Sequence, residues 1–376
     1  MDKPRLGFIV GTRPEAIKVA PVVLEFRKFD SVETLLISSG QHREMLDQSL
    51  AVFGLKPDID LGIMTAGQTL TEVTSRALEG LTKTFKERGI ARVFAQGDTT
   101  TTFCAALAAF YLQIPFDHIE AGLRTDSIST PFPEEFNRRA AGLVASLHYP
   151  PTKWAAENLL KEGKDPKTIH VTGNTGIDAV NLIVKTSSQD WFPEHPGRVI
   201  LLTTHRRENL GEPMSRIATA AREVLEKTPD ALLVVPMHRN PQVREVLMKI
   251  LGDHERVRLI EPPDYEAFVP LMKRAALILT DSGGVQEEAP ALGRPVLVLR
   301  DTTERPEGVE AGAAKLVGTD QKKITGEALN LLNDKEAYHR MQQVVSPYGD
   351  GMASQRVRYW SLKNLGIDSP GVTPWG

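Results

Sequence analysis

The chain has 376 residues, 41% of them hydrophobic and 25% charged, which is long enough for two domains with full hydrophobic cores. A formal net charge of −3 leaves no general basic surface for nucleic acid, and the single cysteine, Cys104, excludes an internal disulfide and a cysteine metal cluster. No apolar run of about 18 residues occurs, and the first residues lead directly into a strand pattern without the apolar core of a signal peptide. We therefore expect a cytoplasmic protein that does not bind nucleic acid or enter a membrane.

Short β-branched runs alternate with amphipathic stretches through the first half of the chain. The strand patterns cover residues 5–11, 33–39, 91–98, 115–121 and 146–151, and residues 69–89 show a clear helical period. This alternation predicts βα units around a parallel sheet.

The second half repeats the rhythm. Its strand patterns cover residues 168–174, 198–205, 231–238, 257–262, 276–282 and 295–300, with helical patterns at 213–229 and 354–366. This number of strands is larger than a single sheet usually holds. We therefore predict an α/β protein with two doubly wound domains. The expected domains are residues 1–173 and 174–352, with a hinge near Gly173–Gly176 and a C-terminal helix, about 353–376, packing back on the first domain.

In such folds ligands bind outside the carboxyl ends of the strands, so the residues that follow each strand are the candidates for chemistry. After the first strand, "GTRPEAIK" offers a tight turn at Gly11 and positive charge at Arg13 and Lys18 beside a helix N-terminus. Neither a dinucleotide fingerprint nor a Walker loop is present. This stretch alone is equally compatible with an anion site and with a helix start that carries solvated charges.

The stretch "DSGGVQEE", residues 281–288, is more specific. Asp281 or Ser282 can cap the helix, and Gly283 and Gly284 let backbone N–H groups approach a diphosphate closely. A cap without a ligand leaves unexplained two consecutive glycines, which cost about 1 kcal/mol each in a helix. Glu288 lies further along, where a carboxylate can accept hydrogen bonds from a ribose diol. Together these residues predict a nucleotide site.

Two strands of the second half end in a His-Arg pair, at His205 and at His238. Beside a diphosphate site, both histidines are candidates to bind phosphate oxygens, sugar or leaving group. The nine histidines show no H-E-x-x-H spacing, so we predict no metal.

The first half contributes acids at Asp98, at Glu120 and at the pair Glu134 and Glu135. Each has a structural alternative: Asp98 as a helix cap, Glu120 paired with Arg124, and the glutamate pair as partners of a helix dipole. Acids at neighbouring strand and helix ends can also form a cluster, which raises the pKa of some members and supplies one protonated acid and one ionised base.

The motifs "GTRPEAIK", "GDTTTT", "HIEAGLRT", "PEEFNRR", "THRREN", "PMHRNPQVRE" and "LTDSGGVQEEAPALGRPVLVLRDTTERPE" occur in order between about residues 5 and 352. Together they resemble the non-hydrolysing UDP-N-acetylglucosamine 2-epimerases. The resemblance implies a glycosyltransferase-B-like fold of two Rossmann-like domains with the active site in the interdomain cleft. It also implies a homodimer that interconverts UDP-N-acetylglucosamine and UDP-N-acetylmannosamine without metal or nicotinamide cofactor, through elimination and re-addition of UDP, to supply cell-surface polysaccharide precursors.

The same resemblance assigns roles to individual residues. The catalytic set is Asp98, Glu120, Glu134 and His205. The substrate contacts are Arg13, Lys18, Arg138, His238, Phe268, Ser282, Gly283, Gly284 and Glu288, with Glu288 at the ribose and Phe268 at the uracil. Contacts to a second, activating UDP-N-acetylglucosamine would come from Gln41, His42, Lys18 and Arg206, although Gly67 stands where some relatives carry an arginine.

The sequence is also compatible with four other functions. They are an epimerase of a modified UDP-sugar such as a diacetamido uronic acid, a hydrolysing variant that releases N-acetylmannosamine, a glycosyltransferase of the same fold, and an inactive nucleotide-sugar sensor. A glycosyltransferase would need only one base and an acceptor groove, and a sensor would bind without turnover.

Overall fold

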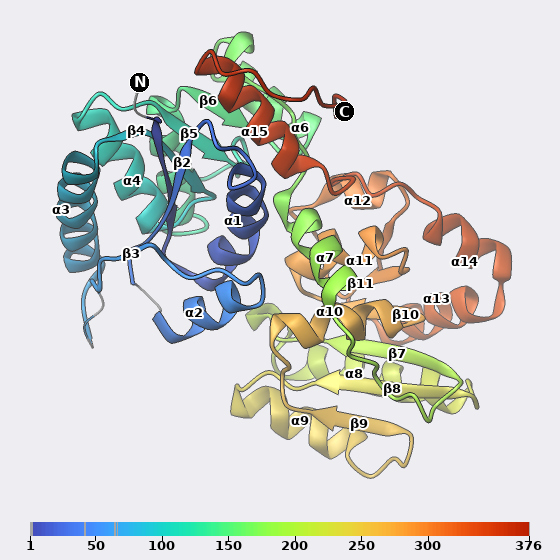
Figure 1. Cartoon of the computed structure of the whole chain (residues 1–376). Helices are drawn as coiled ribbons and strands as arrows, with labels where there is room; N and C mark the ends of the chain where they lie inside the picture. The colour runs from blue at the N-terminus through green and yellow to red at the C-terminus, as the bar shows by residue number, and fades with distance from the viewer. Residues whose placement is uncertain (1–2, 41–42, 64, 66, 376) are drawn as a thin grey trace. The chain divides into compact units, whose positions relative to one another are not determined.

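A computed structural model describes residues 3–40, 43–63, 65 and 67–375, with only the backbone described at 43–45. The chain forms two compact units (Figure 1). The N-terminal unit comprises Met1–Leu182 and Gly349–Gly376, and the C-terminal unit comprises Ile183–Tyr348. The hinge near Gly173–Gly176 stays a prediction.

The N-terminal unit is built on one parallel sheet of six strands in the order β3-β2-β1-β4-β5-β6. The strands are β1 (Arg5–Val10), β2 (Glu33–Ser38), β3 (Ile59–Asp60), β4 (Ile90–Gln96), β5 (Phe116–Ile119) and β6 (Leu147–Tyr149). The strand predicted at 168–174 does not form. That segment runs along β6 of this unit, where Ile169 forms an isolated bridge with His148.

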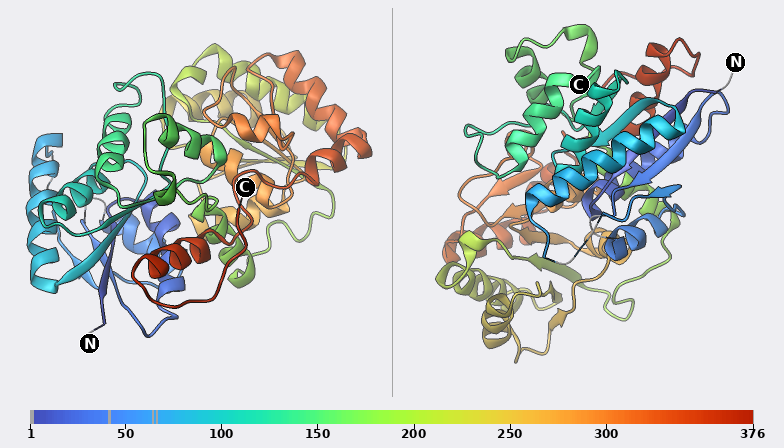
Figure 2. Two further views of the ribbon diagram at one scale, coloured as in Figure 1. Left: turned by 90° about the horizontal axis from the view of Figure 1, so that it is seen from above. Right: turned by 90° about the vertical axis from the view of Figure 1, so that its left-hand side faces the viewer.

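Helices cover both faces of this sheet because its strands are apolar on both sides. Phe8 and Val10 pack with α1 (Arg13–Phe26), α2 (Arg43–Ala51) and α15 (Ala353–Asn364), whereas Ile9 packs with α3 (Leu70–Arg88), α4 (Thr100–Tyr111) and α5 (Glu134–Val144). The right-hand view of Figure 2 shows α3 lying in front of the strands. The unit is completed by α6 (Lys153–Lys161), η1 (Pro166–Thr168) and the start of α7 (Thr175–Thr186).

Helix α3 begins and ends where its sequence predicts. The Thr69 side chain accepts a hydrogen bond from the Glu72 backbone, and the Glu72 carboxylate accepts one from the Thr69 backbone at 2.6 Å. This reciprocal cap satisfies two backbone donors at the helix start. At the other end Gly89 adopts the left-handed conformation at φ 58°, which stops the helix.

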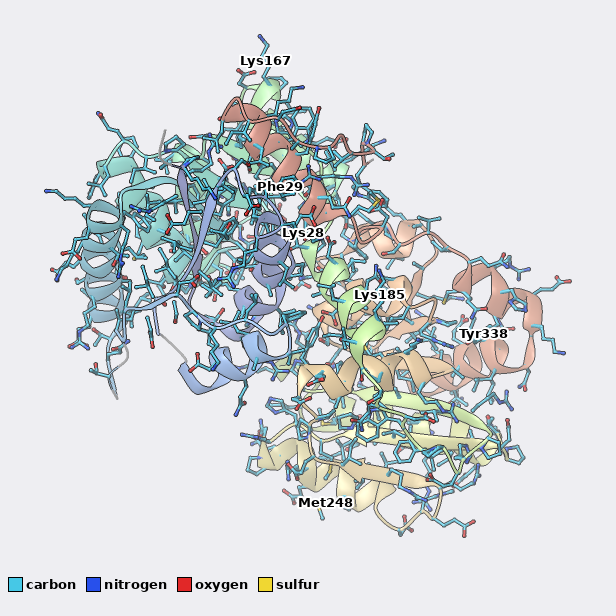
Figure 3. All side chains as sticks on the ribbon, viewed as in Figure 1. Lys28, Phe29, Lys167, Lys185, Met248 and Tyr338 are labelled. Carbon is cyan, nitrogen blue, oxygen red and sulfur yellow. The ribbon has the colours of Figure 1, made fainter. Side chains whose placement is uncertain are left out.

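The last helix, α15, is held on the N-terminal unit by buried polar contacts. Ser361 donates to Asp117 at 2.8 Å, and Arg92 donates to the same carboxylate at 2.8 Å. The guanidinium of Arg358 lies 4.8 Å from the centre of the Phe29 ring, which Figure 3 labels beside this helix. The hydrogen bonds to Asp117 are buried, so they help to fix the position of α15.

The C-terminal unit has a second parallel sheet, in the order β12-β11-β10-β7-β8-β9. Its strands are β7 (Arg198–Thr203), β8 (Ala231–Pro236), β9 (Val257–Ile260), β10 (Leu277–Thr280), β11 (Val296–Val298) and β12 (Ala314–Leu316). Its core packs apolar residues of the sheet against α8 (Glu212–Glu226), α9 (Pro241–Leu251) and α13 (Gln321–Asn333). The remaining helices are η2 (Arg207–Asn209), α10 (Tyr265–Arg274), α11 (Gly283–Ala291), α12 (Pro306–Glu310) and α14 (Lys335–Gln342).

The two sheets share one topology. Counted within its own unit, each runs in the doubly wound order 3-2-1-4-5-6 or its reverse, so the predicted pair of Rossmann-like domains is confirmed. The strand order reverses between β1 and β4 in the first sheet and between β7 and β10 in the second. These switch points are where ligands bind in such folds. Within the described residues, no helix combines the length and apolar character needed to cross a membrane.

Candidate active site

The turn after β1 lies against the turn after β4. A Cβ atom added at Gly11 would lie 2.2 Å from Oγ1 of Thr101, so only glycine fits this approach. Next to it, the buried Glu15 carboxylate accepts hydrogen bonds from the backbone of Gly11 at 2.9 Å and from the Thr99 hydroxyl at 2.5 Å. Glu15 thus joins the two turns at the switch point. The sequence analysis missed this residue, because only the positive charges of "GTRPEAIK" suggested a ligand.

Asp98 follows β4 and does not cap the next helix, since Thr99 is the N-cap of α4. Its carboxylate pairs with the Arg138 guanidinium at 2.5 Å, and its carbonyl accepts a hydrogen bond from the Asn137 amide at 3.0 Å. Burial raises the pKa of Asp98; Arg138 opposes the shift, and the nearby charge of Glu120 adds to it. Lys18 also lowers the pKa and Glu134 raises it. The predicted cluster of carboxyl groups therefore exists around Asp98, and burial favours its protonated form.

Glu120 lies at the end of β5 with a backbone φ of 60°, a left-handed conformation that few residues other than glycine adopt. Its carboxylate accepts hydrogen bonds from the Lys18 ammonium at 2.5 Å and from the Gln96 amide at 2.7 Å. The alternative pairing with Arg124 is wrong, because Arg124 binds Glu162 at 2.6 and 2.8 Å. Strained backbone at a strand end is typical of functional positions.

The adjacent acids Glu134 and Glu135 have different surroundings. Glu135 is fully buried and accepts hydrogen bonds from Arg139 at 2.7 Å and from the Thr125 backbone at 3.2 Å, which marks it as structural. Glu134, the first residue of α5, is half-buried and lies close enough to Asp98 to raise its pKa. Of the pair, Glu134 is therefore the member available for chemistry.

The glycine pair that opens α11 has two different explanations. Ser282 is the N-cap but makes no side-chain cap, and Asp281 turns towards the end of β7 instead, so the predicted side-chain cap is wrong. A Cβ atom at Gly283 would lie 3.0 Å from Cζ of Arg305, which itself pairs with Glu287 at 2.8 Å. At Gly284 the same atom would meet nothing within 4 Å. Protein packing explains Gly283, whereas Gly284 leaves the helix N-terminus open to an anion.

Arg305 places a guanidinium beside this helix start. It comes 21 positions after Gly284 in the chain, and nothing in the "DSGGVQEE" motif pointed to it. Its closeness to Gly283 adds a positive group to the backbone donors of α11, so it belongs to the candidate anion site.

Glu288 lies one turn further along α11 and is half-buried. It accepts a hydrogen bond from the Tyr265 hydroxyl at 3.0 Å. Tyr265 is on α10, the helix that also carries the half-buried Phe268. The two residues predicted for the ribose and the uracil are thus on helices that one hydrogen bond connects.

His205 and His238 follow the neighbouring strands β7 and β8, and their rings stack with centroids 5.5 Å apart. Nδ1 of His205 lies 3.2 Å from Oδ1 of Asp281. Burial lowers the pKa of His238, and the charge of His205 lowers it further. The predicted pair of histidines is therefore brought together at the edge that also carries α11.

The residues predicted for an activator are only partly described. Gln41 and His42 lie outside the described residues. Lys18 binds Glu120, as above, and the guanidinium of Arg206 donates to the Asp281 carbonyl at 3.3 Å. Arg13 is half-buried at the first position of α1. The roles of these residues stay predictions.

Comparison with known proteins gives a consistent result. The family model for UDP-N-acetylglucosamine 2-epimerase matches residues 24–359. A UDP-N-acetylglucosamine 2-epimerase of Bacillus subtilis (strain 168) is 52% identical over 359 residues, covering 95% of this chain and 94% of the relative. A crystal structure of a UDP-N-acetylglucosamine 2-epimerase is 47% identical with a TM-score of 0.93, covering 100% of both chains. The enzyme from Neisseria meningitidis bound to UDP-GlcNAc is 44% identical with a TM-score of 0.86, covering 96% of this chain and 100% of that one.

Proposed function

The chain belongs to the UDP-N-acetylglucosamine 2-epimerase family, and from this premise we propose that it interconverts UDP-N-acetylglucosamine and UDP-N-acetylmannosamine by eliminating and re-adding UDP. It is an isomerase, as its relatives are. Its substrate is a UDP-sugar, the class of ligand bound in the Neisseria meningitidis enzyme.

The chemistry of the sugar requires elimination. The C2 proton has no adjacent carbonyl, so direct removal and return of that proton would be very slow. In the proposed step a carboxylate takes the C2 proton, a double bond forms between C1 and C2, and the C1–O bond breaks with its electrons leaving on UDP. The reverse step adds UDP to C1 of the 2-acetamidoglucal while a proton reaches the opposite face of C2. No oxidant or reductant is needed.

Proton transfer is the role proposed for Asp98, Glu120 and Glu134, with His205 as the fourth catalytic residue. The grouping of these acids supports this assignment: the charges of Glu120 and Glu134 raise the pKa of the half-buried Asp98, and those of Arg138 and Lys18 lower it. Such a cluster holds an acid beside a base, which a reaction that removes one proton and returns another requires. The three acids are proposed to act as one set.

Binding of the leaving UDP is the role proposed for the C-terminal unit. The open N-terminus of α11 at Ser282, Gly283 and Gly284, with Arg305 and His238, offers donors for the diphosphate. Glu288 would accept the ribose hydroxyls and Phe268 would contact the uracil. Arg13 would contribute to the diphosphate and Arg138 to the sugar.

Heavy water tests this mechanism. The purified protein incubated with UDP-N-acetylglucosamine in D2O should place deuterium at C2 of both epimers, as measured by mass spectrometry and NMR. Unlabelled N-acetylmannosamine product would contradict elimination and re-addition. Release of free N-acetylmannosamine would instead indicate a hydrolysing enzyme.

The proposed partner is a second copy of the chain. Helices α4 and α5 pack side by side and expose Phe110 (58%), Tyr111 (63%), Phe136 (48%) and Leu143 (75%). Helix α4 carries no charged residue, so an identical face can cover it without burying a charge. At roughly 100 Å² each, the four side chains present about 400 Å² per copy. Two copies would bury about 800 Å² from them alone, over half of the smallest stable interfaces.

Sedimentation equilibrium tests this interface. Replacing Phe110 and Leu143 together by aspartate should change the mass from twice 41.5 kDa to 41.5 kDa. The same change at Met248, which is exposed on α9 (Figure 3), should leave the dimer intact. A wild-type protein that sediments as a monomer at micromolar concentration would contradict the proposal.

A cytoplasmic location and a supply of precursors for cell-surface polysaccharide complete the proposal. The location is the one expected from the sequence, and the supply of precursors is what the family resemblance implies. Epimerase activity in the soluble fraction of cell extracts, and altered polysaccharide after deletion of the gene, are the expected observations.

A further inference from the structure

The stacked rings of His205 and His238 differ in what faces their Nδ1 atoms. Nδ1 of His238 accepts a hydrogen bond from the backbone N–H of Asn240 at 3.2 Å. Nδ1 of His205 faces Oδ1 of Asp281 at 3.2 Å. A backbone N–H can only donate and a carboxylate can only accept, so the partners assign opposite tautomers. His238 carries its proton on Nε2, and His205 carries its proton on Nδ1.

Asp281 is held rigidly and in its ionised form. Its side chain is fully buried, and its Oδ2 accepts hydrogen bonds from the backbone of His205 and of Arg206, both at 3.0 Å. The Thr204 hydroxyl and the Asn209 amide donate to the same oxygen, both at 2.9 Å. Burial raises the pKa of Asp281, but the hydrogen bonds from His205 and Arg206 outweigh burial and lower the pKa to about 2.

A purely structural reading explains only part of this arrangement. Anchoring the turn after β7 accounts for the four donors to Oδ2. Anchoring this turn does not explain why Nδ1 of His205 lies at Oδ1 of Asp281, because an imidazole ring that only filled space would not need a carboxylate there. The same geometry, a buried carboxylate at Nδ1 of a histidine, fixes the imidazole in hydrolases that use histidine as a proton carrier.

We propose that Asp281 is the positioning residue of His205: it holds the proton on Nδ1 so that Nε2 exchanges a proton with the substrate. This inference rests on the catalytic role proposed for His205. On its face of the sugar, the Nε2 lone pair of the neutral ring accepts the C2 proton of one epimer as the C1–C2 double bond forms and the C1–O bond to UDP breaks. The Asp281 carboxylate stabilises the resulting imidazolium, which returns the proton to C2 when UDP re-adds to C1. His238, with the opposite tautomer, is a fixed Nε2–H donor suited to a phosphate oxygen.

NMR of the wild-type protein tests the tautomers without relying on activity. In protein labelled with 15N-histidine, at about pH 8 where imidazoles are neutral, His205 should show a protonated Nδ1 and a bare Nε2, and His238 the reverse. His205→Gln and His238→Gln assign the signals by their loss. A proton on Nε2 of His205 in an active enzyme overturns this inference alone, whereas a wild-type protein without epimerase activity overturns the proposed function.

The variant Asp281→Asn tests the consequence for turnover. The four donors keep the amide oxygen at the Oδ2 position, so the amide N–H₂ faces Nδ1 of His205 and forces the proton onto Nε2. We expect kcat to fall by about 100-fold or more, with KM and UDP affinity changed less than about threefold. The NMR signals of His205 should show the reversed tautomer.

The variant Thr204→Val is the matched control, because it removes one donor to Oδ2 of Asp281 and leaves the contact with His205. Its kcat should stay within about threefold of the wild type. Equal losses of kcat in both variants, each in step with a lower melting temperature, would show that Asp281 only anchors the turn and would overturn the proposal. If Asp281→Asn does not fold, the wild-type tautomer decides.

Discussion

After β1, β4 and β5 of the N-terminal unit come a tightly packed glycine turn and carboxyl groups, each paired with a cation: Asp98 with Arg138 and Glu120 with Lys18. After β7, β8 and β10 of the C-terminal unit come two stacked imidazoles and an open helix N-terminus. The sheets have the same strand order, so topology does not set this difference. It comes from the residues that follow the strands. We propose that the first edge supplies carboxyl groups for proton transfer and that the second supplies the anion site together with His205.

The adjacent acids of α5 test whether catalytic and structural carboxyl groups can be distinguished within the N-terminal unit. Glu134→Gln should lower kcat by about 100-fold, because a proton carrier is lost. Glu135→Gln should lower the free energy of unfolding by about 1–3 kcal/mol, because its buried hydrogen bonds to Arg139 and the Thr125 backbone are weakened. Steady-state kinetics and urea unfolding measure the two effects. If Glu134→Gln is unstable and Glu135→Gln is stable and inactive, the roles are reversed.

A smaller effect is expected at Gly284, where protein packing leaves room for a side chain. Gly284→Ala should raise the free energy of unfolding by up to about 1 kcal/mol, since alanine is the better helix former. It should also weaken UDP binding by about tenfold, because the methyl group blocks the backbone N–H groups. The matched control is Gly326→Ala on α13, where an added Cβ also meets nothing within 4 Å. It should gain the same stability with unchanged UDP affinity. Tight UDP binding by Gly284→Ala would remove α11 from the anion site.

Most of the fold is predictable from sequence because parallel strands buried on both faces are continuous apolar runs. The missed strands, β3 and β12, have two and three residues, and each contains a charged residue that interrupts the apolar run. The run at 168–174 looks like the start of the second domain, yet the His170 backbone donates to the His148 carbonyl at the edge of the first sheet. Sequence shows that such a run is extended but not which sheet it joins.

The candidate site also contains residues that sequence can indicate and residues that it cannot. Asp98, Glu120, His205 and Ser282 were predictable because each directly follows a strand, and topology brings strand ends together. The partners that tune them were not predictable. Lys18 reaches Glu120 across 102 positions, and Asp281 lies 76 positions from His205. Glu15 and Arg305 were missed for the same reason: their roles depend on which turns and helices become neighbours.

The division between the two edges is tested most directly by measuring kcat and UDP affinity together for Asp98→Asn and Glu288→Gln. Calorimetric titration of UDP and the initial rate of epimerisation supply the two quantities. We expect Asp98→Asn to lose about 1,000-fold in kcat while its UDP dissociation constant stays within about threefold of wild type. Glu288→Gln should weaken UDP binding by about tenfold or more, because a charged hydrogen-bond acceptor is lost. If Asp98→Asn loses UDP affinity as strongly as Glu288→Gln does, the carboxyl groups of the N-terminal unit hold the nucleotide or the fold, and the account is contradicted.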